Sequence, residues 1–141
     1  MRYNKYFKKD ELLYSKIAKK LGINQEECLR RLPPSIEETL KCLSHFLGDV
    51  RIGFNRGPIY VSSAFRCREV NLAVGGVRNS LHQVGAAADI YVCPKDMPDL
   101  YKYIKNNYKC DELYINYTQN YIHVSPSNIY AYGKGKSKTD N

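Results

Sequence analysis

The sequence predicts a single domain that combines amphipathic helices with short strands. Its 141 residues suit one domain by length, and the chain has no internal repeat and no linker that would divide it. Helical periodicity dominates the first third, whereas alternating apolar and polar residues near the C-terminus predict a hairpin of strands. We expect residues 1–132 to form the domain and residues 133–141, GKGKSKTDN, to be a basic, disordered tail.

Two segments carry the periodicity of helices. Residues 10–21, DELLYSKIAKKL, predict one helix, because apolar residues recur at steps of four and Gly22 follows the last turn. In PPSIEETLKCLSHFLG, Ser35 and Glu38 fit a capping box, and isoleucine and leucine recur at steps of three and four. This second helix is expected to end near Gly48.

Shorter patterns predict the remaining elements. Residues 59–65, IYVSSAF, are rich in β-branched and aromatic residues and predict a strand, as do residues 87–92, AADIYV. Helices are expected over residues 67–74, where a Gly-Gly pair follows, and over residues 97–108. The runs ELYIN and YIHVS alternate around TQN and predict an antiparallel hairpin.

Composition and charge limit the classes of function. The net charge of +8 favours anionic partners such as bacterial envelope polymers; nucleic acid is not expected, because several lysines lie in the opening KYFKK and in the tail. Five scattered cysteines without a C-x-x-C pair exclude a zinc ribbon and predict free thiols in a reducing cytosol. No segment is long and apolar enough for a membrane span, and we expect no secretory signal.

The segment SLHQVGAAADI, residues 80–90, places His82 and Asp89 around one glycine and three alanines. One reading is a tight turn into a buried strand, with His82 on the surface and Asp89 as a turn or cap residue. The other is metal binding, in which the small side chains let the backbone and a substrate approach the ion closely. This segment alone leaves both readings open.

His123, in YIHVS, is a third candidate ligand. Because side chains alternate along a strand, its apolar neighbours face the core and His123 faces the opposite, polar side. A hydrogen-bonded sheet histidine is the alternative for this residue. A catalytic zinc ion takes three protein ligands and leaves a fourth position open, and His82, Asp89 and His123 would supply that set. The remaining histidine, His45, lies within a helix and is expected to be partly exposed.

Three motifs together resemble the zinc D-Ala-D-Ala carboxypeptidase family, which includes D-Ala-D-Ala dipeptidases and phage L-alanyl-D-glutamate endolysins. They are SSAFRCREVNLAVGG, NSLHQVGAAADI and YIHVS, which keep the family pattern S-x-H-x-x-G-x-A-x-D and a later H-V-S. The resemblance extends through AKKLGINQ and PPSIEETL, and so covers most of residues 10–127. It implies a small α+β fold of the Hedgehog and D-Ala-D-Ala peptidase type, with helices packed on an antiparallel sheet. It also implies Zn²⁺ bound by His82, Asp89 and His123.

The same resemblance assigns roles to two further residues. The family's arginine falls on Arg66 in SSAFR, where a fixed cation would stabilise the oxyanion formed when water attacks an amide. A structural ion pair is the alternative for Arg66. Ser80 would bind the substrate or orient the loop, and Phe65 stands where the family has a tyrosine, which removes a hydroxyl.

The sequence departs from the family at the general base. Family members place a glutamate in the penultimate strand, whereas the run DELYIN has Asn116 at that position. A hairpin that turns through residues 118–121 would set Asn116 directly across from His123. Glu112 shares that face but lies four residues back, roughly 13 Å at about 3.3 Å per residue, and is expected to be too far to replace the missing base unless the register of the hairpin changes.

Two functions of different class remain. In the first, the protein is a working zinc peptidase that cuts peptidoglycan stem peptides, as a carboxypeptidase or endopeptidase of phage or prophage origin. In the second, it is a catalytically impaired, zinc-binding relic that serves as a cell-wall-binding module or as a structural part of a virion or tail assembly. In either case we expect synthesis in the bacterial cytoplasm without a signal peptide, and a place of action at the cell wall or in the virion.

Overall fold

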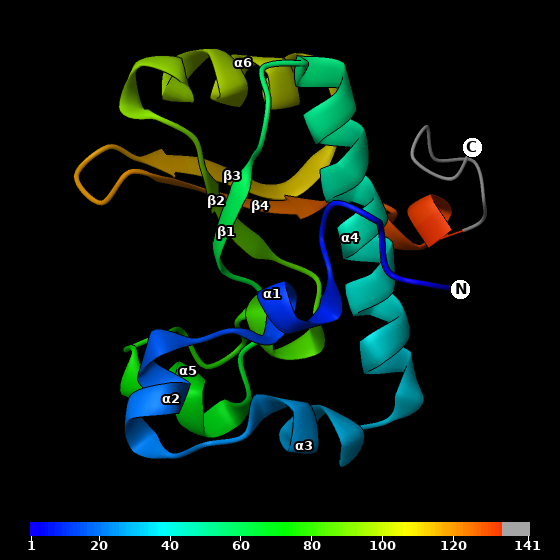
Figure 1. Ribbon diagram of the computed structural model, residues 1–141, viewed down its shortest axis with the longest axis vertical. Helices are drawn as coiled ribbons and strands as arrows, with labels where there is room; N and C mark the ends of the chain where they lie inside the picture. The colour runs from blue at the N-terminus through cyan, green and yellow to red at the C-terminus, as the bar shows by residue number, and fades with distance from the viewer. Residues whose placement is uncertain (134–141) are drawn as a thin grey trace.

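The centre of the molecule is a four-stranded antiparallel sheet with the strand order β1-β2-β4-β3. A computed structural model describes residues 1–133, so the expected tail lies, apart from its first residue, outside the described residues. The strands are β1 (Tyr60–Ser63), β2 (Ala88–Tyr91), β3 (Cys110–Asn116) and β4 (Tyr121–Pro126). Figure 1 shows helices gathered around this sheet, which confirms the predicted α+β fold.

The longest helix, α4 (Pro34–Phe54), runs along the side of the sheet, and α6 (Met97–Asn107) lies above the sheet at the top of the view (Figure 1). The predicted end of α4 at Gly48 is wrong. The helix passes through this glycine, whose lack of a Cβ leaves room for the side chain of Asn4 packed against it. It ends instead at Asn55, a C-cap in the left-handed region with φ 54°.

Most residues in the middle of α4 are buried, and His45 is among them. The side chain of His45 is buried, with the residue only 5 % exposed, and its Nε2 lies 2.7 Å from the backbone carbonyl of Arg2. The expectation that His45 is partly exposed is therefore wrong. Within residues 1–133, no helix combines the length and the apolar character that a membrane crossing requires.

The single helix expected over residues 10–21 is divided into α1 (Lys9–Leu13) and α2 (Lys16–Leu21). Two hydrogen bonds cause the break. The carbonyl of Leu12 accepts from the backbone N–H of Phe65, and the hydroxyl of Ser15 accepts from the N–H of Ala18, which makes Ser15 the N-cap of a new helix. The first of these bonds joins segments far apart in the sequence.

The sequence did not predict the helix α3 (Gln25–Arg30). It lies with α1, α2 and α5 (Arg68–Ala73) at the end of the molecule opposite α6 (Figure 1). The side chain of Gln25 is buried and ties this end together. Its amide donates to the carbonyls of Leu13 and Phe65 and accepts from the N–H of Cys67. Three short 3₁₀ helices complete the part of the chain that the structure describes: η1 (Leu81–Val84), η2 (Pro94–Asp96) and η3 (Ile129–Gly133).

The register of the β3-β4 hairpin differs from the predicted one. Tyr114, not Asn116, pairs with His123, and Asn116 pairs with Tyr121. The turn begins directly after Asn116, whose side-chain oxygen accepts from the N–H of Gln119, and it closes at Asn120 in the left-handed region. Because the turn comes earlier than expected, every residue of β3 stands opposite a different partner.

Candidate metal centre

Two of the three predicted ligands are neighbours across the sheet. Asp89 of β2 pairs with His123 of β4, so both side chains leave the same face at the same level. The Oδ1 atom of Asp89 lies 2.9 Å from Nδ1 of His123. The apolar neighbours of His123 in β4, Ile122 and Val124, are fully buried on the other face, as alternation along the strand predicts.

His82 reaches the same point from the 3₁₀ helix η1. Its Nδ1 donates to the carbonyl of Ala64, and its own carbonyl accepts from the N–H of Arg66. Gly85 ends η1 with φ 74°, and a Cβ there would lie 3.1 Å from the carbonyl oxygen of Ile36 in α4. Glycine is therefore required both for the turn and for the close approach of η1 to α4.

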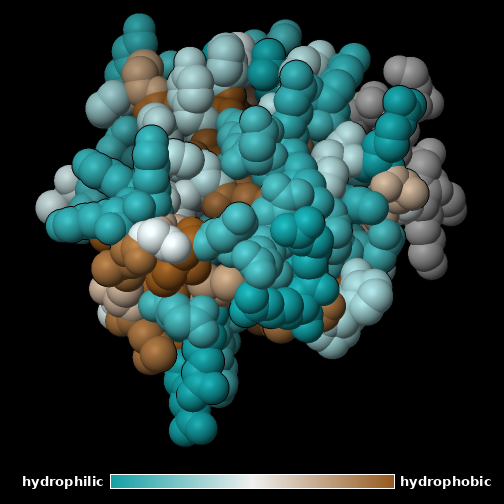
Figure 2. All heavy atoms as spheres, turned by 60° about the horizontal axis from the view of Figure 1, so that its bottom comes forward, coloured by the Kyte–Doolittle hydropathy of each residue, from teal (hydrophilic) through white to brown (hydrophobic). Residues whose placement is uncertain are grey.

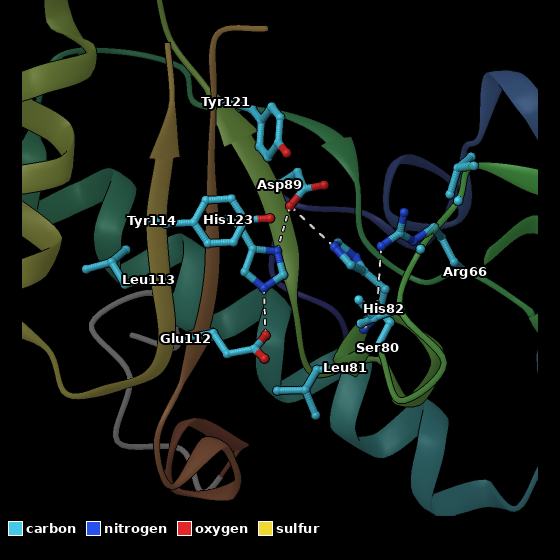
Figure 3. A pocket seen from close by; sticks show the side chains of 14 residues that line it. Arg66, Ser80, Leu81, His82, Asp89, Glu112, Leu113, Tyr114, Tyr121 and His123 are labelled. Carbon is cyan, nitrogen blue, oxygen red and sulfur yellow. Dashed lines mark hydrogen bonds and ion pairs between the residues drawn. The ribbon is translucent and has the colours of Figure 1, made fainter. Parts of the chain in front are cut away.

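The three side chains present one donor atom each to a common point (Figure 3). These donors are Nε2 of His82, Oδ1 of Asp89 and Nδ1 of His123, and the ligand atoms of the three residues lie within 4.8 Å of one another. Nε2 of His82 has no hydrogen-bond partner, although its side chain is only 1 % exposed. In the neutral ring the proton is on Nδ1, so Nε2 faces the Asp89 carboxylate at 3.3 Å as a second acceptor, and a cation between them would satisfy both; only the protonated ring can donate to Asp89.

The charges of the cluster also suit a cation. Burial raises the pKa of Asp89, but contacts with His123 and His82 outweigh burial and lower the pKa to about 2. Burial lowers the pKa of His123, whereas its hydrogen bonds to Asp89 and Glu112 raise it by more. Asp89 is therefore ionised at neutral pH, as a metal-ligating carboxylate must be.

Glu112 lies beside this centre, contrary to the expectation from the sequence. Its Oε1 is 2.7 Å from Nε2 of His123, because the register that made it too distant is not the one observed. Glu112 pairs with Ser125, so in the observed register it is the diagonal neighbour of His123 on the same face. Because Glu112 holds the proton of Nε2, Nδ1 of His123 is the nitrogen that faces Asp89 and His82; in the metal-free protein Nδ1 donates to Asp89, and a cation bound there would displace that proton.

Two tyrosines that the sequence did not single out hold the other side of the His123 ring. Tyr114 stacks on His123 with ring centroids 4.9 Å apart and an interplanar angle of 17°, and Tyr121 packs edge-on against Tyr114. Burial, together with a hydrogen bond to Tyr121, raises the pKa of Tyr114 to about 12, so its hydroxyl keeps its proton at neutral pH. The ring of His123 is thus fixed by stacking as well as by its two carboxylate contacts.

Arg66 and Ser80 face the centre from the opposite wall (Figure 3). Arg66 is half-buried, and its Nη2 donates to the hydroxyl of Ser80 at 3.4 Å, while its buried Nε has no hydrogen-bond partner in the structure. Arg66 makes no ion pair within residues 1–133, so the structural ion pair considered as an alternative is not formed there. Burial lowers the pKa of Arg66 despite the nearby Asp89, which means that its charge is not fully compensated.

Ser80 has a local structural role in this arrangement. It is the N-cap of η1, and its hydroxyl accepts from the N–H of His82 at 3.2 Å. The same hydroxyl also accepts the hydrogen bond from Nη2 of Arg66. Ser80 therefore links the turn that carries His82 to the guanidinium of Arg66. Its buried position is consistent with orienting the loop.

These residues line a cavity of about 620 Å³ whose rim on one side is apolar. Val74 and Val77, with the two glycines between them, form that rim. Val77 is 73 % exposed, and it belongs with Leu21 and Leu72 to the exposed apolar side chains of the α2-α5 end. Figure 2 shows apolar residues gathered on this face of the molecule, at the lower left.

The alanines of the segment at residues 80–90 do not line the cavity. Ala87 and Ala88 are fully buried, and the carbonyl of Ala86 accepts from the hydroxyl of Ser125. Their small size serves the packing of the turn into β2 against the core, so the suggested role in letting substrate approach a metal is wrong for them.

The structure therefore brings together five of the six predicted site residues and separates the sixth. His82, Asp89, His123, Arg66 and Ser80 line one cavity, whereas Asn116 lies at the turn and is not part of the lining. The sequence interpretation missed Glu112, Tyr114 and Tyr121. The signal for Glu112 and Tyr114 was their alternation on the face of β3 that carries polar residues, and it was misread because the turn was placed too late.

An α+β domain with two histidines and one carboxylate converging beside an arginine defines a candidate hydrolytic metal centre. The family model of peptidase M15 matches residues 5–125, so the chain belongs to the peptidase M15 family, the zinc-dependent family to which the sequence motifs pointed. No curated protein matches the chain.

Proposed function

We propose that the protein is a zinc-dependent peptidase that hydrolyses peptidoglycan stem peptides, as a carboxypeptidase or an endopeptidase. The observation that carries this proposal is the convergence of His82 Nε2, Asp89 Oδ1 and His123 Nδ1 in a cavity that also holds an unpaired arginine. These three residues would hold the zinc ion. Zinc supplies Lewis acidity, which polarises a scissile carbonyl and acidifies the attacking water.

Arg66 is the group that meets the developing negative charge. Its guanidinium is held by Ser80 yet keeps a buried N–H without a partner, and it stands across the cavity from His123. A preorganised donor of this kind stabilises an oxyanion more than it stabilises the neutral carbonyl of the substrate. Arg66 therefore lowers the barrier to attack on the amide.

Glu112 is the proton acceptor in this proposal. Apart from Asp89, it is the one carboxylate among the described residues that line the cavity. In the structure one of its oxygens lies 2.7 Å from Nε2 of His123, on the ring edge away from Nδ1, so the Glu112 side chain would have to turn toward the three ligands to take the proton of the attacking water. The side chain of Glu112 is 46 % exposed, which leaves it free to exchange that proton with solvent.

The substrate is a short peptide of the cell wall. The cavity of about 620 Å³ suits a few residues, and its apolar rim at Val74 and Val77 suits small side chains such as those of alanine. The net charge of +8 favours an anionic polymer such as the bacterial wall. The resemblance to endolysins extends the proposal to a phage or prophage protein that acts at the wall or as part of a virion.

One observation favours a second function. Asn116 stands at the position where the family has its glutamate, and an amide takes no proton. If Glu112 only orients His123, the chain is a zinc-binding relic that recognises wall peptides or forms part of a virion. The presence of Glu112 in the cavity makes the peptidase the better supported of the two.

The direct experiment is digestion of purified peptidoglycan, with and without a chelator, followed by chromatography and mass spectrometry of the released fragments. We expect peptide fragments with new termini, their loss on chelation and their return when zinc is added. Stoichiometric zinc in a folded protein that releases no fragment would favour the relic.

A further inference from the structure

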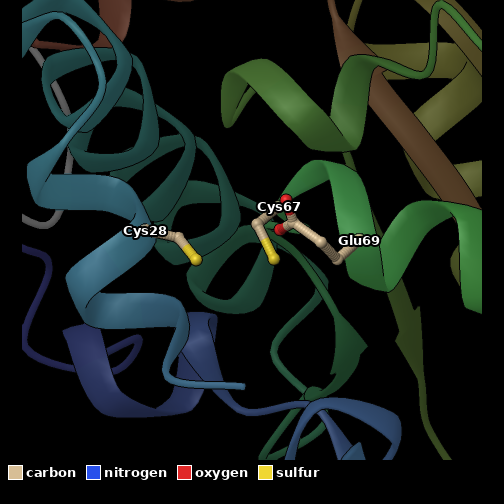
Figure 4. Close-up of side chains that lie close together, drawn as sticks. All are labelled: Cys28, Cys67 and Glu69. Carbon is tan, nitrogen blue, oxygen red and sulfur yellow. The ribbon is translucent and has the colours of Figure 1, made fainter.

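A second group of metal-ligating side chains lies outside the cavity, where α3 meets the start of α5. Cys28 of α3, Cys67 at the N-cap of α5 and Glu69 in the first turn of α5 point toward one another (Figure 4). One ligand atom from each lies within 4.8 Å of the other two. None of the three residues lines the cavity of the candidate metal centre.

The positions of these side chains are fixed by a buried hydrogen-bond hub. Gln25 accepts from the N–H of Cys67 at 3.0 Å and donates to the carbonyl of Phe65, so it holds the segment before α5 against the first turn of α3. Cys28 follows Gln25 by three residues on α3 and therefore lies on the same face of that helix. The two thiols meet because a polar side chain already joins the segments that carry them.

We propose that Cys28, Cys67 and Glu69 form a second metal site, which binds a zinc-type divalent cation through two thiolates and one carboxylate. The donors match the ligands of this borderline-soft ion, and solvent supplies the fourth position. A tetrahedral site with Zn–S bonds of about 2.3 Å needs sulfur atoms about 3.7 Å apart, so the donors need contract by only about 1 Å. Glu69 is exposed and gives the ion a path from solvent.

The third donor favours a cation over a disulfide between the two cysteines. A disulfide would use both sulfur atoms and leave the carboxylate without a function. A dication would use all three donors: it pairs with the carboxylate and displaces one proton from each thiol to solvent.

An occupied site would join α3 to the segment that carries Arg66, the residue directly before Cys67. Its role is structural, since the cluster lies outside the candidate peptidase cavity, and the proposal does not depend on peptidase activity. Metal bound only by the folded state adds stability by mass action. A zinc-dependent rise in melting temperature is therefore expected even when the peptidase centre has been disabled.

Cobalt distinguishes the two centres, because only a thiolate site gives a sulfur-to-cobalt charge-transfer band in the near ultraviolet. The metal-free full-length protein, kept reduced with a phosphine, is titrated with Co²⁺ and followed by absorption. We expect the band in the wild type and in His82→Ala, and its loss in Cys28→Ser and Cys67→Ser. Cys93→Ser, which removes an exposed thiol hydrogen-bonded to Asp96, is the matched control and should keep the band.

Glu69→Gln tests the third ligand at an exposed position that does not threaten folding. It should weaken cobalt binding at this site by about tenfold or more, since two ligands hold a metal poorly. Circular dichroism checks that each variant is folded. Three results would each overturn the proposal. The first two are a folded wild type without the band and a band that survives both cysteine substitutions. The third is a protein that loses two of its five thiols to a disulfide in air and binds no cobalt.

Discussion

Replacing Asp89 by asparagine should change how the stability of the metal-free protein depends on pH. Contacts with His123 and His82 lower the pKa of Asp89 from 3.8 to about 2, against the effect of burial. At about 1.36 kcal/mol per unit, this shift corresponds to about 2 kcal/mol of folding free energy. The side chain is only 15 % exposed, so solvent screening does not cancel the effect.

The sign follows from the direction of the shift. The folded-state pKa lies below the unfolded one, so the stabilisation is present above pH 3.8 and is lost as the pH falls toward 2. The amide that replaces the carboxylate does not titrate in this range. The difference in unfolding free energy between wild type and Asp89→Asn should therefore shrink by about 1.5 kcal/mol between about pH 5.5 and about pH 2.5.

Urea unfolding in the presence of a chelator, followed by circular dichroism at each pH, measures this difference. Asp10→Asn, which removes an exposed carboxylate of α1 outside the cavity, controls for the general loss of one negative charge. A difference for Asp89→Asn that is independent of pH would show that the two histidines do not hold this carboxylate ionised, and the account of the cluster's charge would fail.

Three other substitutions have distinct expected outcomes. His82→Ala should lose about one equivalent of zinc per chain, measured by mass spectrometry of the metal, because it leaves two ligands at the candidate centre; unchanged zinc would exclude His82 as a ligand. Arg66→Ala should lower turnover of wall peptides by about 10²–10³ with zinc unchanged, and a variant that unfolds would instead indicate a structural role. Asn116→Ala should lower the free energy of unfolding in urea by about 0.5–1.5 kcal/mol, because the N–H of Gln119 loses its acceptor. Turnover should be retained, and a large loss of turnover would show that Asn116 takes part in catalysis.

The candidate ligands could be predicted because each depends on local sequence. Alternation along YIHVS places His123 on the face opposite the core, and the same periodicity places Asp89 beside it in the neighbouring strand. His82 lies in a turn whose glycine and serine are both needed for its geometry. The family resemblance then joined these local signals into one centre.

The general base was misassigned because register depends on where a turn closes. The sequence offers Asn116 and Asn120 as turn residues, and they form a turn one step earlier than the predicted one. Since pairing in a hairpin follows from the turn, a small displacement exchanged Asn116 for Tyr114 as the partner of His123. In this register the side chain of Glu112 is long enough to bring its carboxylate to the ring of His123 in the neighbouring strand.

Other differences arise from tertiary contacts that local patterns do not contain. The break between α1 and α2 depends on a hydrogen bond from Phe65, and Gly48 lies within α4 as a contact site for the side chain of Asn4 rather than as the end of the helix. The position of α3 depends on Gln25, a polar residue whose burial is stable only because three backbone groups satisfy it.

The role of Glu112 is the central claim, and Glu112→Gln tests it most directly. Glutamine still accepts the proton of Nε2 of His123, so the ring keeps its orientation and zinc content should stay at the wild-type level. Because the amide takes no proton, turnover of peptidoglycan fragments should fall by about 10²–10⁴. Turnover at the wild-type level in the zinc-loaded variant would contradict the account, since it would mean that Glu112 only positions His123 and that another group accepts the proton.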